Sequence, residues 1–346
     1  MSKKFPRLSK RLIVIPMVCL LVMAGLVTLM AVRGAGPSYV DEPEYGNKLA
    51  PAVTVPDTTA SNGSAVRFGT GTSNVMRFNL STWNAHADVN SLGAANQLKT
   101  QIFNVTDVVG LQEFSDKTAL DEVRALLLCA TCGYDSTITT YTWEGSSPNK
   151  VLIVWKKSKF TKVTSGIQNA TPPATVNDST SATVPAKFNV WVKLRENSTG
   201  KQFYLINTHF LNGVESGGRP RTENGARLTL YYTHMTKSLE LINQLKADNI
   251  PIFMTGDFNV NYKYDKDIRS PGFPYVKFPT VGARSTYQIL NYTGLSADPG
   301  TNSSGDRLID YIVHVTRPDV TIRSQAISPT QYGSDHYMYT NAIELR

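Results

Sequence analysis

The feature that most constrains the fold is a series of short apolar runs, rich in β-branched residues, that alternate along the chain with amphipathic stretches. The runs predict strands, because their length and composition are typical of a buried sheet: Met76–Thr82, Val105–Gln112, Val151–Trp155, Phe188–Leu194, Phe203–Thr208, Ile250–Thr255 and Leu308–Val313. The amphipathic stretches predict helices, because apolar residues recur every three or four positions: Asn90–Phe103, Thr118–Leu128 and Asn224–Ala247. This alternation predicts one α/β domain.

Two further segments are expected to be loops. Residues 164–183 and 271–304 are rich in Pro, Gly, Ser and Thr, which favour turns over regular structure. Residues 34–73 have a similar composition with little apolar periodicity, and they predict a flexible tether. The folded domain is therefore expected to span residues 74–346.

The N-terminus has the composition of a targeting segment. Basic residues precede an uncharged apolar run from Leu12 to Val32, which as a helix is about 31 Å long, close to the thickness of a bilayer core. Residues 1–33 are therefore predicted to be either a retained signal-anchor or a signal peptide cleaved after Ala24. Both alternatives place the domain outside the cytoplasm, membrane-anchored or secreted, because the basic flank stays inside.

The net charge of +8 mainly reflects this N-terminal segment. Six of the 35 basic residues lie within residues 1–33, and the other 29 nearly balance the 27 acidic residues. The charge alone therefore does not demand a polyanionic partner. Two local basic clusters, Lys150–Lys162 and Arg219–Arg227, are either part of a binding face or ordinary solvated surface. We expect a monomer.

The three cysteines predict at most one disulfide in the domain. Cys19 lies in the apolar run, whereas Cys129 and Cys132 form a C-x-x-C. An exported protein favours a small structural disulfide here. A redox site is disfavoured, because the pair follows a helical stretch instead of opening one.

Six short segments carry polar groups suited to phosphate or to a hard cation. They are Ser81–Asn84, Gly110–Glu113, Ile206–Phe210, Thr255–Asn259, Arg307–Ile312 and Gly333–His336. Most of them follow an apolar strand, and side chains at strand ends tend to gather at one edge of an α/β sheet. Each segment alone is common, but six in one chain predict a shared site.

In their order and content these segments resemble the motifs of the endonuclease/exonuclease/phosphatase superfamily, over about residues 75–346. The matching letters are W-N, Q-E, T-H, G-D-F-N, I-D-Y-I and S-D-H. The resemblance implies a four-layer α/β sandwich, in which two packed mixed β-sheets have helices outside (DNase-I-like). It also implies a Mg²⁺-dependent hydrolase of phosphate esters, with Mn²⁺ as a possible substitute.

The resemblance assigns a role to each motif residue. Glu113 would be the principal metal carboxylate, with Asn84 beside it and Asp335 supporting the metal side. Asp257 and Asn259 would orient the attacking water and the phosphate. His336, with Asp310 as its carboxylate partner, would contact the scissile phosphate, and His209 would contact it from the other side.

Some of these roles have alternatives in the sequence itself. Asp310 can pair with Arg307 or a lysine instead of His336. The carboxylate partner of His209 is open, because the strand Val151–Trp155 follows Asn149 where DNase-I-like members have a glutamate, and Glu144 is several residues earlier. In this respect the chain resembles relatives that have an asparagine at this position, and the resemblance implies Asn149 as a candidate phosphate contact.

The first expected substrate is nucleic acid, and a phospholipid or a small phosphate ester is the alternative. Membrane tethering would suit a lipid substrate, but the only apolar candidate for membrane contact is Phe273–Phe278. A non-catalytic binding module is disfavoured, because all six segments keep their polar side chains.

Overall fold

The computed structural model describes residues 74–86, 96–114, 117–138, 148–177, 182–290, 300–303 and 306–346, without the side chains of residues 117–119. The predicted N-terminal segment, the predicted tether and Glu144 lie outside these residues. Across the part of the chain that is described, no helix has both the length and the apolarity needed to cross a bilayer.

The first sheet runs in the order β15 (Val320–Ile327), β16 (Tyr339–Leu345), β1 (Met76–Asn84), β2 (Val108–Gln112), β4 (Leu152–Lys156) and β3 (Tyr134–Ser136). The neighbours β1 and β2 are parallel, and the other neighbouring pairs are antiparallel. Because β1 and β2 run in the same direction, their carboxyl ends lie at the same edge of the sheet.

The second sheet runs in the order β13 (Ala283–Ser285), β14 (Asp310–Val315), β12 (Ile252–Asp257), β9 (Gln202–His209), β8 (Lys187–Glu196) and β5 (Phe160–Thr171). It is also mixed, with β9 and β12 parallel. Two short hairpins accompany the sheets: β6 (Ala174–Thr175) with β7 (Thr183–Val184), and β10 (Glu215–Ser216) with β11 (Arg219–Pro220).

The main core fills the space between the two sheets. Phe78 of β1 stacks on Phe203 of β9, with ring centroids 4.7 Å apart, and meets Phe253 of β12 edge-on. Strand β2 contributes to two cores, since Val108 belongs to the core between the sheets and Val109 to a second cluster outside the first sheet. This division follows from the alternation of side chains along a strand.

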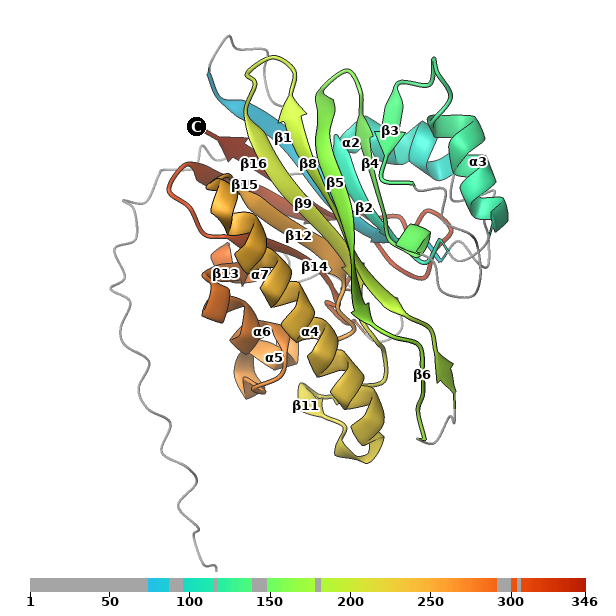
Figure 1. Cartoon of the computed structure of the whole chain (residues 1–346), viewed down its shortest axis with the longest axis vertical. Helices are drawn as coiled ribbons and strands as arrows, with labels where there is room; N and C mark the ends of the chain where they lie inside the picture. Colours follow the sequence, from blue (N-terminus) through green and yellow to red (C-terminus); the bar gives the residue numbers. More distant parts are fainter. Residues whose placement is uncertain are drawn as a thin grey trace, which may run out of the picture. The chain divides into compact units, whose positions relative to one another are not determined.

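Helices cover the outer faces, and together with the two sheets they confirm the four-layer sandwich (Figure 1). Over the first sheet lie η1 (Leu98–Ile102), α2 (Phe103–Val105) and α3 (Lys117–Leu127). The second sheet is covered by α4 (Gly225–Leu245), α5 (Tyr262–Ile268), α6 (Pro274–Lys277) and α7 (Thr286–Ile289). Short 3-10 turns complete the layers: η2 (Pro148–Lys150), η3 (Thr222–Asn224), η4 (Lys246–Asp248) and η5 (Phe278–Val281).

Both predicted loops contain regular structure. Strand β5 occupies the first half of segment 164–183 and pairs with β8, because an edge strand tolerates an exposed polar face and Thr fits an extended backbone. Segment 271–304 contains α6, η5, β13 and α7, which are too short to show a helical period. Phe273 and Phe278 in this segment are buried, so they do not form an exposed apolar hairpin.

The predicted disulfide is confirmed, since Cys129 and Cys132 are bonded just after α3.

Candidate active site

The strand register places three of the predicted residues side by side at one edge of the second sheet. Asp257 is the last residue of β12, and its direct partners are His209 on β9 and Asp310 on β14. In the first sheet, Asn84 ends β1 and Glu113 follows β2 directly. The packing of the two sheets then brings both edges to one place.

The side-chain amide of Asn84 joins the two sheets at this edge. Its Nδ2 donates to Glu113 Oε1 at 3.0 Å and to Asp257 Oδ2 at 3.2 Å. Its Oδ1 accepts from the backbone N–H of His86 at 3.1 Å. Asn84 therefore holds two carboxylates close together, which offsets part of their mutual repulsion.

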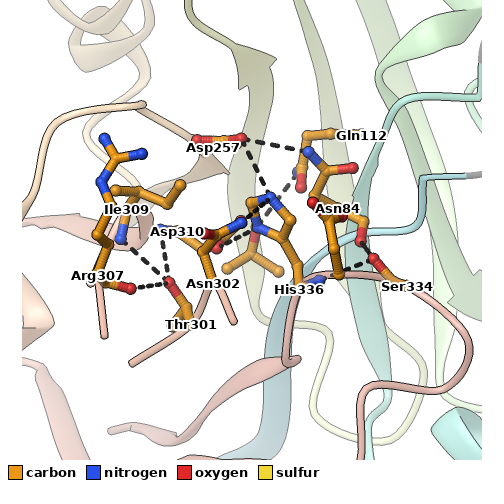
Figure 2. Close-up of polar contacts among 12 residues, drawn as sticks. Asn84, Gln112, Asp257, Thr301, Asn302, Arg307, Ile309, Asp310, Ser334 and His336 are labelled. Carbon is orange, nitrogen blue, oxygen red and sulfur yellow. Dashed lines mark hydrogen bonds and ion pairs between the residues drawn. The ribbon is translucent and has the colours of Figure 1, made fainter. Parts of the chain in front are cut away.

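A buried carboxylate–imidazole pair lies next to them. His336 Nδ1 is 2.7 Å from Asp310 Oδ2, and His336 Nε2 is 3.9 Å from Asp257 Oδ2. The side-chain amide of Asn302 lies 3.0 Å from the same Nε2 (Figure 2), and its oxygen faces the ring when the ring is charged, because a cationic imidazole only donates. Thr301 Oγ1 accepts from the backbone N–H of Asp310, which fixes the strand end that carries the carboxylate.

His209 approaches from the other side of Asp257. Its Nε2 lies 3.7 Å from Asp257 Oδ2 and 3.8 Å from Glu113 Oε1. Asn259 Nδ2 is 3.4 Å from that nitrogen, and the backbone N–H of Asn259 donates to Asp257 Oδ1 at 2.8 Å. Among the described residues, the carboxylates close to His209 are therefore those of Glu113 and Asp257.

Two of these residues have a left-handed backbone that is unusual outside glycine. The φ angles are +62° at Glu113 and +54° at Asn259. Such conformations cost about 1–3 kcal/mol and gather at functional sites. In both places the chain turns sharply at the end of a strand and directs the side chain into the shared site.

The burial of these groups gives them distinct charge states. Burial and the neighbouring charge of Asp310 raise the pKa of Asp257 to about 7. Burial would lower the pKa of His336, but the charge and hydrogen bond of Asp310 raise it to about 10. Burial, with the positive charge of Lys187, holds the pKa of His209 well below its usual value. At neutral pH the site therefore combines a cationic His336 with a neutral His209.

A buried amide network supports the site from beneath. Gln112 Nε2 donates to Asn207 Oδ1 at 2.7 Å, and Asn207 Nδ2 donates back to the carbonyl of Leu111 at 2.8 Å. These bonds connect the two sheets through fully buried groups, whose loss leaves costly unpaired polar atoms. Gln112 therefore has a structural role, whereas its neighbour Glu113 lines the cavity.

Most of the predicted residues line a cavity of about 490 Å³, within the range of about 300–1,000 Å³ typical of small-molecule sites. Its lining comprises Glu113, His209, Asn212, Gly213, Arg221, Asn224, Arg227, Asp257, Asn259, Asn302, Arg307, Ile309, Asp335 and His336. We call the part of the lining that is formed by the acidic residues and the histidines the acidic end. The lining also contains three arginines, Arg221, Arg227 and Arg307.

The donor set at the acidic end fits a divalent cation. Ligand atoms of Asp257, Asp310 and His336 lie within 4.8 Å of one another, close enough to share an ion. A charged imidazole has no free lone pair, however, so the Asp310–His336 pair is better suited to proton chemistry. The carboxylates of Glu113 and Asp257 offer the oxygen ligands that Mg²⁺ prefers.

Two predicted residues lie apart from this centre. Asp335 lines the cavity, but its carboxylate is half exposed and lies 3.3 Å from His86 Nδ1. Asn149 is buried in η2, and the cavity lining drawn from the described residues does not include it. The turn that holds Asn149 packs behind Glu113, because Phe114 N–H donates to the carbonyl of Lys150.

Sequence reasoning missed several residues of the cavity. Asn302 lies in a segment predicted to be a loop, with no motif to mark it. Arg221 and Arg227 belong to the basic cluster Arg219–Arg227, which the sequence alone allows to be either a binding face or solvated surface. Arg307 was an alternative partner for Asp310, but it pairs with Glu215 instead, at 3.1 Å.

Comparison with solved structures finds the same fold in several proteins of low identity. An endonuclease/exonuclease/phosphatase family protein from Bacteroides thetaiotaomicron has a TM-score of 0.53 and 16% identity, over 79% of this chain and 96% of the other. The human Nocturnin catalytic domain, with a bound sulfate anion, has a TM-score of 0.52 and 20% identity, over 78% and 94%. ANGEL2, a 2′,3′-cyclic phosphatase in complex with adenosine-2′,3′-vanadate, has a TM-score of 0.54 and 17% identity, over 79% and 96%. These likenesses concern the fold.

Comparison with curated proteins returned no match. The family profile of the Endonuclease/Exonuclease/phosphatase family matches residues 81–336. The matched range begins with Ser81 in the W-N segment and ends with His336 in the S-D-H segment, so it includes every strand end described above. The chain therefore belongs to the endonuclease/exonuclease/phosphatase family.

Proposed function

We propose that the protein is a divalent-metal-dependent phosphodiesterase whose substrate is a nucleic acid. The observation that carries the proposal is the convergence of Glu113, His209 and the Asp310–His336 pair on Asp257. Phosphoester hydrolysis needs a water to be activated, a phosphoryl charge to be offset and a leaving group to be stabilised. The cluster provides one group for each task.

Each residue has a role that follows from its charge and position. The cationic His336 donates from Nε2 to a phosphoryl or leaving-group oxygen, and Asp310 keeps that proton on the ring. Asp257, whose pKa of about 7 suits a general base near neutral pH, accepts the proton of the attacking water. The neutral His209 and the amide of Asn259 hold a phosphoryl oxygen on the opposite side.

Mg²⁺, or Mn²⁺ in its place, would be held by Glu113, which leaves Asp257 available as the general base. When bound, it polarises a phosphoryl oxygen and offsets charge in the transition state. Asn84 acts here as the residue that positions the two carboxylates, because both of its Nδ2 hydrogen bonds go to them.

Nucleic acid is the preferred substrate class for two reasons. Among proteins of the same fold, ANGEL2 is a 2′,3′-cyclic phosphatase in complex with an adenosine vanadate. The cavity also adds arginines to the reacting groups, as a phosphate chain requires. The phospholipid alternative loses its one apolar candidate for membrane contact, because Phe273 and Phe278 are buried.

A small phosphate ester remains the second candidate, because the cavity volume of about 490 Å³ suits one nucleotide-sized ligand. A panel of substrates separates the candidates. The full-length chain is incubated with supercoiled DNA, RNA, sphingomyelin and a nucleoside monophosphate, each with Mg²⁺, Mn²⁺ or EDTA. His209→Ala and His336→Ala are compared with His314→Ala, a buried histidine outside the cavity lining.

The proposal expects DNA or RNA to be cut with Mg²⁺ or Mn²⁺ but not with EDTA, and neither active-site variant to retain activity. Cleavage of sphingomyelin or of the monophosphate alone would contradict the nucleic-acid substrate. The absence of any cleavage by a folded chain would contradict the enzymatic role.

Export by the N-terminal segment is also part of the proposal. Its support is the uncharged run Leu12–Val32 behind a basic flank. Residues 1–73 fused to alkaline phosphatase, which is active only outside the bacterial cytoplasm, should give active reporter in bacteria. An inactive reporter, with the fusion recovered in the cytoplasm, would contradict export.

A further inference from the structure

The cavity extends beyond the reacting groups to a second wall with a different chemistry. This wall is built by the chain from the end of β9 to the first turn of α4, with Asn212, Arg221, Asn224 and Arg227 in the lining. Arg307, from the chain just before β14, lines the same space. We call these three arginines and two asparagines the basic wall.

Arg227 is fixed before any ligand arrives. It lies in the first turns of α4, is only 7% exposed, and its Nη1 is 3.2 Å from Asn212 Oδ1. The adjacent Gly213 has φ +71°, and a Cβ there would lie 3.4 Å from Arg227 Cδ. The arginine therefore packs along a glycine backbone, and its guanidinium needs little ordering when an anion binds.

Arg307 connects the basic wall to the reacting groups. Its Nη2 donates to Glu215 Oε1 at 3.1 Å and to the backbone carbonyl of Asn259 at 3.2 Å. The same Asn259 contacts His209. The guanidinium thus lies beside the turn that holds the phosphoryl-contacting residues, and Figure 2 shows Arg307 on the same side of Asp257 as Ile309.

Arg221 is the most accessible cation of the basic wall. Its Nε donates to Glu223 Oε1 at 2.9 Å, but both side chains are exposed, at 43% and 61%. An exposed ion pair of this kind contributes about 0–1 kcal/mol. Arg221 can therefore exchange Glu223 for a ligand anion at little cost.

We propose that the basic wall is a subsite for a second phosphate of the substrate, separate from the phosphate that is cleaved. Arginine forks bind phosphate oxygens in pairs and do so better than lysine. The start of α4 adds partial positive charge, and Gly225 at that end faces open space. The inference rests on the proposed function, because it takes the scissile phosphate to lie at Asp257 and the two histidines.

A second anchoring point has a kinetic consequence. Binding energy from a remote group can be used to position the reacting group. Two linked phosphates also bind more tightly than one, provided that their spacing matches the distance between the reacting groups and the basic wall. The enzyme would therefore select substrates by the distance between phosphates.

Binding of simple bisphosphates tests the subsite without requiring turnover. The full-length chain, purified in detergent with excess Mg²⁺, is titrated by calorimetry with alkanediol bisphosphates of graded length and with the matching monophosphates. At one length we expect the bisphosphate to bind at least about tenfold more tightly, whereas two equivalent ends alone give a factor of about two.

Substitutions then test whether the tighter binding of bisphosphates depends on the arginines of the basic wall. Arg221→Gln/Arg227→Gln should reduce the bisphosphate preference to about two, and Arg221→Gln alone should reduce it several-fold if the double variant does not fold. Arg219→Gln is the matched control, because Arg219 is an exposed arginine of β11, two residues before Arg221 and outside the cavity lining. It should leave the preference unchanged.

Hydrolysis of bis(p-nitrophenyl) phosphate, measured on the same samples, separates the two claims. Suppose that the chain hydrolyses this substrate but binds every bisphosphate only about twofold more tightly than its monophosphate. This result would overturn the subsite and leave the proposed phosphodiesterase activity standing. A strong preference that the arginine variants do not reduce would also overturn it. A strong, arginine-dependent preference without turnover would support the subsite and contradict the proposed function.

Discussion

Replacing Asp310 by Asn tests the charge assignment at the centre of the site. The substitution keeps the shape of the side chain but removes the negative charge 2.7 Å from His336 Nδ1. The pKa of His336 is raised from 6.5 to about 10, which at 1.36 kcal/mol per unit corresponds to roughly 5 kcal/mol in favour of the charged ring. Asp310 provides most of this, and burial acts in the opposite direction.

Without Asp310, burial dominates and the His336 ring should be neutral at pH 7. We expect kcat for bis(p-nitrophenyl) phosphate to fall by about 10²–10⁴-fold, the usual contribution of a positioned acid or base. The pH profile should change as well. In the wild type, loss of the ring proton limits activity only as pH approaches 10; in Asp310→Asn that limit should move below neutral pH.

Asp265→Asn is the matched control for a buried carboxylate. Asp265 is fully buried on α5, and burial raises its pKa to about 7, but it does not line the cavity. This control should keep wild-type kcat. The reasoning is refuted if Asp310→Asn stays folded, retains kcat within about threefold and keeps the wild-type pH profile, since general acid–base help is worth far more.

Three further outcomes follow from other parts of the structure. Glu113→Gln should raise the Mg²⁺ concentration for half-maximal rate by at least about tenfold, because a neutral amide holds the cation weakly; an unchanged Mg²⁺ titration would speak against a metal ligand. Gly110→Ala should lower the free energy of unfolding by about 1–3 kcal/mol, because the new Cβ meets Thr255 Oγ1 and Asn207 Oδ1; urea denaturation measures the loss, and equal stability would argue against the tight sheet packing. Burial raises the pKa of Glu344, but hydrogen bonds from three arginines lower it to about 2. The ionised Glu344 therefore stabilises the fold above pH 4.5, and this stabilisation is lost as pH falls toward 2. Glu344→Gln should lower the free energy of unfolding by about 2–3 kcal/mol at pH 7, and denaturation curves at several pH values should show a weaker dependence of stability on pH.

The fold class was predictable because its signal is local. Strands β1, β2, β9 and β12 are apolar runs that end in or next to polar motif residues, and β14 is an apolar run that begins with one, Asp310, so each could be found without knowing its neighbours. Strand β5 could not be found in this way. Its side chains are largely polar and exposed, and its hydrogen bonds to β8 are what make it a strand.

The candidate site shows the same division. Residues at strand ends, such as Asp257 and His209, could be predicted to meet because the sheet register fixes them. Asn302 and Arg227 could not, because the path of long connections between strands decides where they lie. Asn149 lies in the turn η2 and is as buried as Asp257, so its expected contact with the phosphate stays a prediction.

The rate of bis(p-nitrophenyl) phosphate hydrolysis by the metal-stripped chain, before and after Mg²⁺ is restored, tests the central claim most directly. The measurement is made on the wild type and on His336→Gln. The account predicts no turnover after stripping, full recovery with Mg²⁺, and a rate for His336→Gln at least about 10²-fold lower than wild type. Equal rates with and without metal, or a His336→Gln enzyme as fast as wild type, would contradict it.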